Sequence, residues 1–248
     1  MIQFRNVTKV FGTGDAAVRA INDLSFTIPQ GEFWAIMGPS GSGKSTVLHL
    51  VAGLTPPSSG QVLVGGEDVS RMTSSQAATL RRRRVGYILQ TFNLMPFLTA
   101  AENVGMPLVL DGVRQSEINR RVQAALDLVK MGHRGGHHPA TLSGGEQQRI
   151  AVARALVIDP VIILADEPTG NLDRANGRAV MDLIQEINDG TGVTVLLVTH
   201  DPVFAAYATR VLRLVDGALQ QDMQLTEEPG EPESSEPGGR SWSGRCAR

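Results

Sequence analysis

Residues 38–45 carry the clearest chemical pattern in the sequence, because they match all eight positions of G-x-x-x-x-G-K-[ST]. Glycines at this spacing let the backbone curl so that successive N–H groups face one anion. Lys44 would then reach the outer phosphates of a nucleotide, and the Ser45 hydroxyl suits a hard cation such as Mg²⁺. A glycine turn with a chance lysine is the alternative. The pattern predicts a nucleotide-binding P-loop made of Gly38, Pro39, Ser40, Gly41, Ser42, Gly43, Lys44, Ser45 and Thr46.

Two adjacent carboxylates, Asp166 and Glu167, follow an apolar run at residues 161–165. Beside a P-loop the two groups have different tasks. Asp166 would hold Mg²⁺ or a water bound to it, and Glu167 could polarise the water that attacks a γ phosphate. The alternative interpretation is the acidic start of an ordinary loop, so the pair gains its meaning from the P-loop.

Hydrophobic periodicity indicates an α/β fold with a mostly parallel sheet to position these groups. Strands are predicted at residues 2–4, 24–28, 33–37, 61–64, 161–165 and 193–198. Helices are predicted from the P-loop to Gly53 and at residues 117–129, 147–157 and 177–187. Ligands of a parallel sheet gather beyond the carboxyl ends of its strands, which is where the P-loop and the acidic pair fall.

Composition excludes several classes of protein. The chain has 248 residues, enough for one or two domains, and its 23 basic and 25 acidic residues give a net charge of -2. Bulk polyanion binding is therefore a poor first hypothesis. The single cysteine, Cys246, cannot form an internal disulfide. No run approaches the ~18 apolar residues of a membrane span, so a membrane role is expected to come through a partner.

A second motif, LSGGEQQR at residues 142–149, precedes the acidic pair. Ser143, Gly144 and Gly145 open a predicted helix, so a hydroxyl, free N–H groups and a helix dipole form a second anion site. Ser143 and Glu146 also fit a capping box, which explains those two residues but not the glycine pair. The motif resembles the signature of the ATP-binding cassette (ABC) ATPases, where it also follows a helical subdomain and precedes an Asp-Glu strand.

The resemblance covers about residues 1–222 and implies further roles. Gln90 corresponds to the Q-loop glutamine near Mg²⁺, Asp173 to the D-loop and His200 to the switch histidine that contacts the γ phosphate. Phe11 sits where an aromatic ring stacks on adenine, with core packing as the alternative. The resemblance thus implies catalytic roles for Lys44, Gln90, Glu167 and His200. It implies that Mg²⁺ is bound by Ser45, Gln90 and Asp166. It also implies that ATP contacts, besides the P-loop, Phe11, Gln90, Ser143, Gly144, Gly145, Glu146, Asp166, Asp173 and His200.

The resemblance also implies an architecture. We expect an ABC ATPase domain at residues 1–225, with a P-loop NTPase (RecA-like) core, an antiparallel N-terminal β-subdomain and an inserted helical subdomain at about 92–158. Residues 226–248 are rich in Glu, Pro, Gly and Ser and are predicted to be a disordered tail.

A chain with one copy of each motif needs a second cassette, because a single P-loop leaves the γ phosphate open on one side. In the ABC family the signature of another subunit closes the site, so we expect two cassettes, most simply a homodimer, around two ATP molecules. An integral membrane subunit would receive the motion, with the cassette peripheral at the cytoplasmic face of the inner membrane. Residues 91–99 would form part of its docking groove or a small subdomain core. Residues 90–94, 102–104 and 142–173 are similar to the LolD/MacB group, which implies export or lipoprotein release.

Other interpretations stay open. ABC-type ATPases also act on nucleic acid or ribosomes, but those usually carry two cassettes or a long coiled-coil insertion. A kinase or GTPase would not explain Ser143 and His200. The arginines at residues 81–84 lack interleaved aromatic residues, so we expect a solvated helix end, or contact with acidic loops or lipid headgroups, and no nucleic acid. His133, His137 and His138 are expected to be loop residues and not a metal site.

Overall fold

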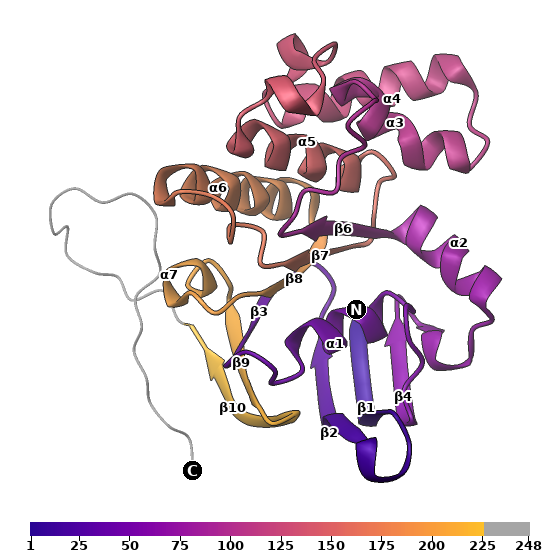
Figure 1. Cartoon of the computed structure of the whole chain (residues 1–248), viewed down its shortest axis with the longest axis vertical. Helices are drawn as coiled ribbons and strands as arrows, with labels where there is room; N and C mark the ends of the chain where they lie inside the picture. Colours follow the sequence, from indigo (N-terminus) through magenta and orange to yellow (C-terminus); the bar gives the residue numbers. More distant parts are fainter. Residues whose placement is uncertain (226–248) are drawn as a thin grey trace, which may run out of the picture.

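The computed structural model describes residues 1–225, and the predicted tail at 226–248 lies outside them. Two sheets form the scaffold, with helices above and beside the larger one (Figure 1). The smaller sheet is antiparallel, in the order β2-β1-β4-β5, and consists of β1 (Ile2–Phe11), β2 (Val18–Ile28), β4 (Ser59–Val64) and β5 (Glu67–Asp68). The predicted strands at residues 2–4, 24–28 and 61–64 lie within it.

The larger sheet has the order β10-β9-β3-β8-β7-β6. Its strands are β3 (Phe33–Met37), β6 (Val85–Leu89), β7 (Ile162–Asp166), β8 (Thr194–Val198), β9 (Arg210–Val215) and β10 (Ala218–Gln224). Every pair except β9 with β10 is parallel. The predicted α/β fold, with an antiparallel N-terminal sheet and a mostly parallel second sheet, is confirmed. Because β8 lies between β3 and β7, the loops after these three strands meet at one edge.

Seven α-helices connect the strands of the described part. They are α1 (Lys44–Val51), α2 (Ser74–Arg84), α3 (Ala100–Leu110), α4 (Gln115–Leu128), α5 (Gly144–Leu156), α6 (Arg174–Thr191) and α7 (Pro202–Ala205). Short 3-10 turns lie at Gly14–Ala16, Val69–Arg71, Gly132–Arg134 and Pro139–Thr141. The four predicted helices correspond to α1, α4, α5 and α6.

The larger sheet separates two apolar cores, because successive side chains of a strand point to opposite faces. In β3, Phe33 and Ala35 pack toward α3, α4, α5 and α6, whereas Trp34 and Ile36 pack toward α1 and the small sheet. Both sets are almost fully buried, and each large apolar side chain contributes about 1.5–3 kcal/mol by leaving water. The P-loop helix α1 and the signature helix α5 therefore cover opposite faces of one sheet.

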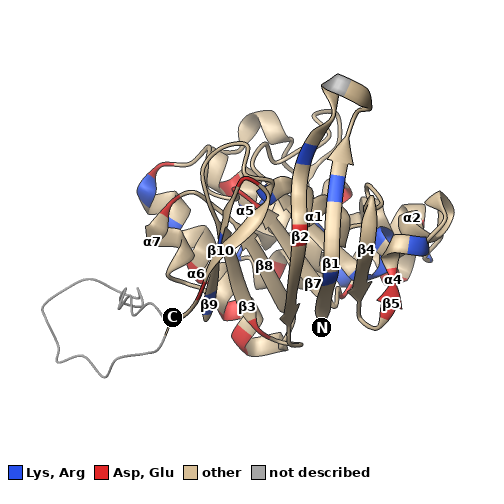
Figure 2. Cartoon of the chain, turned by 90° about the horizontal axis from the view of Figure 1, so that it is seen from below, with Lys and Arg blue, Asp and Glu red and all other residues tan. Residues whose placement is uncertain are grey.

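The arginines at the end of α2 contact acidic groups and backbone carbonyls of the same chain. Figure 2 marks the basic residues of α2 in blue and the acidic residues of β5 in red. Arg82 and Arg83 both donate to Asp111, the residue that follows α3, at 2.7 and 2.9 Å. Arg84 pairs with Glu67, and Arg81 donates to carbonyls at the end of α1. The run thus joins α2 to α3 and to the small sheet, which agrees with contact to acidic loops.

Candidate functional site

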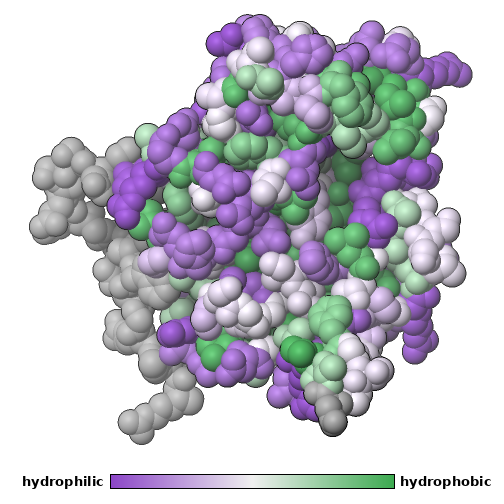
Figure 3. Space-filling model, viewed as in Figure 1, coloured by the Kyte–Doolittle hydropathy of each residue, from purple (hydrophilic) through white to green (hydrophobic). Residues whose placement is uncertain are grey.

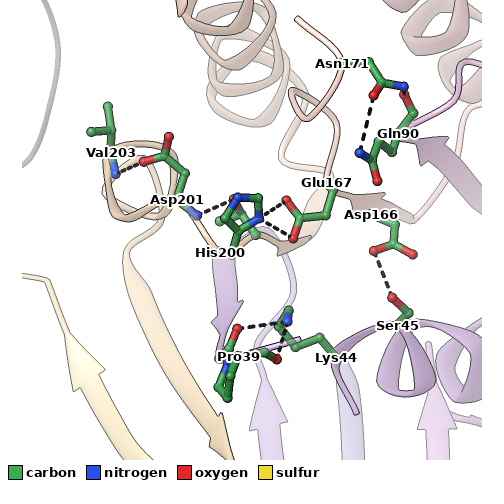
Figure 4. A network of polar contacts seen from close by, with 12 residues as sticks. Pro39, Lys44, Ser45, Gln90, Asp166, Glu167, Asn171, His200, Asp201 and Val203 are labelled. Atoms are coloured by element: carbon green, nitrogen blue, oxygen red, sulfur yellow. Dashed lines mark hydrogen bonds and ion pairs between the residues drawn. The ribbon is translucent and has the colours of Figure 1, made fainter. Parts of the chain in front are cut away.

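The P-loop lines a cavity of about 290 Å³ at the carboxyl end of β3 (Figure 4). Gly43 stands at the N-cap of α1 with φ +97° and offers no side chain to the first turn, so the N–H groups there remain available to a ligand. Glu167 closes the cavity from the end of β7. The residues that line it are Ala20, Ser40, Gly41, Gly43, Lys44, Ser45, Thr46, Glu167 and Val198.

Three of the predicted P-loop residues do not line this P-loop cavity. Gly38 and Pro39 face a neighbouring hollow with His200 and Arg213. A Cβ at Gly38 would lie 2.0 Å from the carbonyl oxygen of Leu214, so glycine is required there by the close approach of β9. Ser42 is buried, and its hydroxyl has no hydrogen-bond partner within residues 1–225.

Lys44 is folded back onto its own loop. Its Nζ donates to the carbonyl oxygens of Gly38 and Pro39, each at 2.9 Å, and the side chain is buried (Figure 4). These carbonyls hold the ammonium at the mouth of α1, where an incoming phosphate would exchange with them as its partner. The geometry is consistent with the predicted contact to a nucleotide phosphate.

Ser45 and Asp166 bring two oxygen groups together from different elements. The Ser45 Oγ at the start of α1 donates to Asp166 Oδ1 at the end of β7, over 3.2 Å. Burial raises the pKa of Asp166, while the Ser45 hydrogen bond and the charge of His49 oppose that shift. A hydroxyl and a half-buried carboxylate are ligands that a hard cation such as Mg²⁺ prefers, so these residues fit the predicted cation site.

Gln90 is turned away from that pair. Its side-chain nitrogen donates to Asn171 Oδ1 over 3.4 Å, and Asn171 returns a hydrogen bond to the Gln90 carbonyl at 3.0 Å. Figure 4 shows this exchange above Asp166. Gln90 is at the site, but its side chain does not contact Ser45 or Asp166.

Glu167 and His200 are in direct polar contact. His200 Nδ1 lies 2.9 Å from both carboxylate oxygens of Glu167 (Figure 4). The Glu167 side chain is 18% exposed and that of His200 is 70% exposed. Glu167 has φ +48°, a left-handed conformation that costs a non-glycine residue of order 1–3 kcal/mol and concentrates at functional sites. Its backbone N–H donates to Val198 at 2.9 Å, which holds the strained residue beside β8.

The signature residues do not reach the P-loop of the same chain. Ser143 caps α5 with the predicted capping box, in which its backbone N–H donates to Glu146 Oε2 at 2.8 Å. That hydrogen bond is the main reason why the pKa of Glu146 lies below its usual value. Gly144 and Gly145 form the first turn of α5, against Leu172 and Asn176. The predicted ATP contacts of these residues therefore need a nucleotide that is bound elsewhere.

Asp173 and Phe11 also lie outside the P-loop cavity. Asp173 caps α6 by accepting from the Asn176 N–H at 2.9 Å, and this bond lowers its pKa. The Phe11 ring is 43% exposed at the end of β1, and the Lys9 ammonium lies 4.7 Å from its centre. Because the ring is exposed, packing in the core does not account for an aromatic residue at position 11. The exposed ring is available to stack on the adenine of a nucleotide.

Several positioning side chains were not predicted. Gln148 is fully buried, and its Nε2 donates to the carbonyls of Pro168 at 2.7 Å and Leu89 at 3.3 Å. It thus ties α5 to the residues next to Glu167 and Gln90. A signal was present, because Gln148 falls four residues before the buried Val152 and places an amide on the apolar face of α5. Arg154, which donates to the carbonyls of residues 92 and 93, gave no such signal.

The three histidines near the signature show no metal cluster. His137 lies beside the Arg134 guanidinium, at 3.2 Å. Within residues 1–225 no group of three or more His, Cys, Asp or Glu side chains is arranged to hold a metal ion.

The comparisons with known proteins agree with this geometry. The family described as ABC transporter matches residues 21–170. An uncharacterized ABC transporter ATP-binding protein of Thermotoga maritima is 44% identical over 220 residues, which cover 89% of this chain and 94% of that protein.

Two solved structures are also similar. The ATP-binding cassette MJ0796, in a dimeric post-hydrolysis state bound to ADP and Pi, has a TM-score of 0.83 and 38% identity, and covers 91% of this chain and 99% of its own. The protein cbiO1 of Clostridium perfringens, part of the ABC transporter complex cbiONQ, has a TM-score of 0.81 and 26% identity, and covers 90% and 88%.

The family match spans more than half of the chain, and a 44% identical relative extends along nearly all of it. The chain combines the fold of an ATP-binding cassette with three features of its site. These are a P-loop after β3, an Asp-Glu pair at the end of β7, and the helix α5, which Ser143 caps and which begins with two glycines. The chain belongs to the ABC transporter family, in which it is an ATP-binding subunit with ATPase activity.

Proposed function

We propose that two identical copies of the chain close head to tail around two ATP molecules. The observation that carries this proposal is that α1 and α5 cover opposite faces of one sheet, so Ser143 cannot complete the P-loop cavity of its own chain. A second copy, turned by a two-fold axis, would offer its Ser143, Gly144 and Gly145 to the open side of the γ phosphate. The similarity to a cassette solved as a dimer supports this arrangement.

Within each site, Glu167 is the proposed general base. Its carboxylate borders the P-loop cavity and would accept a proton from the water that attacks the γ phosphate. His200, 2.9 Å from Glu167, would orient that carboxylate and contact the phosphate. Lys44 would leave the carbonyls of its own loop to bind the phosphates, and Ser45, Asp166 and Gln90 would hold Mg²⁺. When bound, the cation supplies positive charge that offsets the charge of the phosphates.

We further propose that the cassette comprises residues 1–225, with a helical subdomain at about 92–158, and that it drives a separate membrane subunit. No helix within residues 1–225 is both long enough and apolar enough to span a membrane. A groove of about 420 Å³ runs between α2 and α3, and Met95 and Leu110 on its walls are exposed. Figure 3 shows apolar side chains on this face, where Figure 1 draws α3 and α4.

Phe97, two residues after Met95 in the chain, is 72% exposed, which favours a docking surface over a small subdomain core for this part of residues 91–99. We propose that an integral membrane subunit docks there, with the cassette peripheral at the cytoplasmic face of the inner membrane. The similarity to cbiO1, part of a transporter complex, supports a membrane partner. Export or lipoprotein release of the LolD/MacB kind rests on the sequence resemblance. Co-purification of a membrane protein with the tagged chain from detergent-solubilised membranes, abolished by Phe97→Asp, tests the docking site.

The experiment that tests the paired mechanism is Glu167→Gln. Removal of a general base slows a reaction by roughly 10²- to 10⁴-fold but leaves the nucleotide contacts in place. We therefore expect the variant to accumulate a dimer in size-exclusion chromatography with ATP and Mg²⁺. Glu186→Gln, which changes the same charge on the exposed face of α6, is the matched control and stays monomeric. A Glu167→Gln variant that remains monomeric with ATP and Mg²⁺ would contradict the mechanism.

A further inference from the structure

Three buried side-chain atoms lack a hydrogen-bond partner within residues 1–225, and all three belong to elements of the site. They are Ser42 Oγ in the P-loop, Gln148 Oε1 in α5 and the hydroxyl oxygen of Tyr87 in β6. Buried polar groups are nearly always paired in folded proteins, so an unpaired one calls for an explanation such as a ligand or water. The Tyr87 hydroxyl is a strong donor that no step described above uses.

The strand register places Tyr87 near Asp166. Strand β6 pairs with β7 in parallel, with Tyr87 opposite Leu164 and Leu89 opposite Asp166. Tyr87 and Asp166 are thus on neighbouring strands, two residues apart in register and on the α1 side of the sheet, where the Tyr87 ring packs. Strand spacing and rise put their Cα atoms roughly 8 Å apart, which a phenol ring can span. Burial raises the pKa of Tyr87, and the negative charge of Asp166 raises it further.

One oxygen of the Asp166 carboxylate is available to accept a hydrogen bond. Its Oδ1 accepts from Ser45 at 3.2 Å, whereas its Oδ2 accepts no hydrogen bond from residues 1–225. A buried donor without an acceptor and a carboxylate oxygen without a donor therefore lie on one face of the sheet. An ordered water between the two groups would connect them.

We propose that Tyr87 is a positioning residue that donates a hydrogen bond to Asp166 in the state that holds ATP and Mg²⁺. This inference rests on the proposed function of Ser45 and Asp166. If the Ser45 oxygen held the cation, its O–H could still donate to Asp166 Oδ1, and a hydrogen bond from the Tyr87 hydroxyl to Oδ2 would fix the orientation of the carboxylate from its other side. Tyr87 itself contacts neither the nucleotide nor the cation.

The test is Tyr87→Phe, which removes one oxygen and keeps the ring. ATP affinity is measured by calorimetry with Mg²⁺ and with EDTA, in a Glu167→Gln background that slows turnover. We expect the gain in affinity that Mg²⁺ provides to fall about two- to tenfold, the value of one hydrogen bond, while affinity in EDTA is unchanged. Without nucleotide the melting temperature is equal or higher, because the lost hydroxyl had no partner.

Tyr207→Phe is the matched control, because the other tyrosine donates to Asp182 at 2.7 Å. It lowers the melting temperature with and without ATP and leaves the Mg²⁺ effect intact. A Tyr87→Phe protein with the full Mg²⁺ effect overturns the positioning role. So does an equal loss of affinity in EDTA and in Mg²⁺. If the parent protein shows no Mg²⁺-dependent ATP binding, the proposed function fails instead.

Discussion

Gln148 offers a sharp test of how the sheet edge is held together, because one buried side chain reaches two site segments. Gln148→Leu removes hydrogen bonds to Pro168 at 2.7 Å and to Leu89 at 3.3 Å. Each such bond contributes about 1 kcal/mol, and the buried carbonyls lose a partner as well. Loss of the unpaired Gln148 Oε1 offsets part of this cost. We expect a net loss of about 1–2 kcal/mol, or a melting temperature about 2–8 °C lower.

Activity should fall more than stability explains. A loss of 1–2 kcal/mol from a typical total of roughly 5–15 kcal/mol leaves nearly every molecule folded at 25 °C. Leu89 and Pro168 adjoin Gln90 and Glu167, however, and a displacement of roughly 1 Å can reduce a rate about 10²-fold. We therefore expect kcat to fall about 10- to 100-fold, as measured by phosphate release at 25 °C with saturating ATP and Mg²⁺.

The neighbouring glutamine provides the control. Gln147 donates to Leu142 at 3.0 Å, at the start of its own helix, and reaches neither site segment. Gln147→Leu should leave kcat within about threefold of the parent. A Gln148→Leu protein that melts lower but keeps its kcat would refute the positioning argument. An unchanged melting temperature would show that the two hydrogen bonds contribute nothing to stability.

Two other changes test the phosphate site and an ion pair. Lys44→Ala removes a charged donor worth about 1.5–3 kcal/mol, so ATP affinity should fall roughly 10- to 150-fold in calorimetry, and unchanged hydrolysis would reject the P-loop assignment. Asp111→Asn removes the carboxylate whose pKa is lowered, chiefly by the hydrogen bond from Arg83. Because the folded pKa lies below the unfolded value of about 3.9, the ion pair stabilises at neutral pH and is lost as the pH falls through the folded pKa. The melting temperatures of the parent and Asp111→Asn should therefore differ at pH 7 and converge below about pH 4, and an equal difference at both would count against the ion pair.

Elements with an uninterrupted pattern could be predicted from the sequence. The apolar run at residues 161–165 corresponds to β7, which is buried on both faces and has no polar break. Strand β1 was predicted too short, since beyond Phe4 polar side chains and three register shifts against β2 break the alternation. Helix α3 was not predicted, and Pro107 lies inside it. The β9–β10 hairpin was also absent from the prediction, although Asp216 and Gly217, both with positive φ, are a strong hairpin signal.

The candidate site also has parts that could be predicted from the sequence and parts that could not. The P-loop is contiguous in sequence, so its residues could be assigned without knowledge of the fold. Contacts made across the sheet could not. Gln148 and Asn171 act by donating to carbonyls of other segments, and a carbonyl carries no sequence signal of its own. The sequence also does not indicate that the P-loop residues line two separate hollows. That arrangement depends on how closely β9 approaches Gly38.

The pairing of Glu167 with His200 shows why strand order decides this chemistry. The two residues are 33 positions apart. The sequence places each at the carboxyl end of a strand, but a parallel sheet can arrange its strands in several orders. Only adjacency of β7 and β8, with Asp166 opposite Val198, brings the residues that follow them within hydrogen-bond distance. The hydrogen bond from the Glu167 N–H to Val198 then fixes the left-handed turn that aims the carboxylate at His200. The contact of the proposed base with His200 therefore depends on the crossover connection through α6. The length and handedness of this connection bring the chain back to the sheet next to β7, where it forms β8.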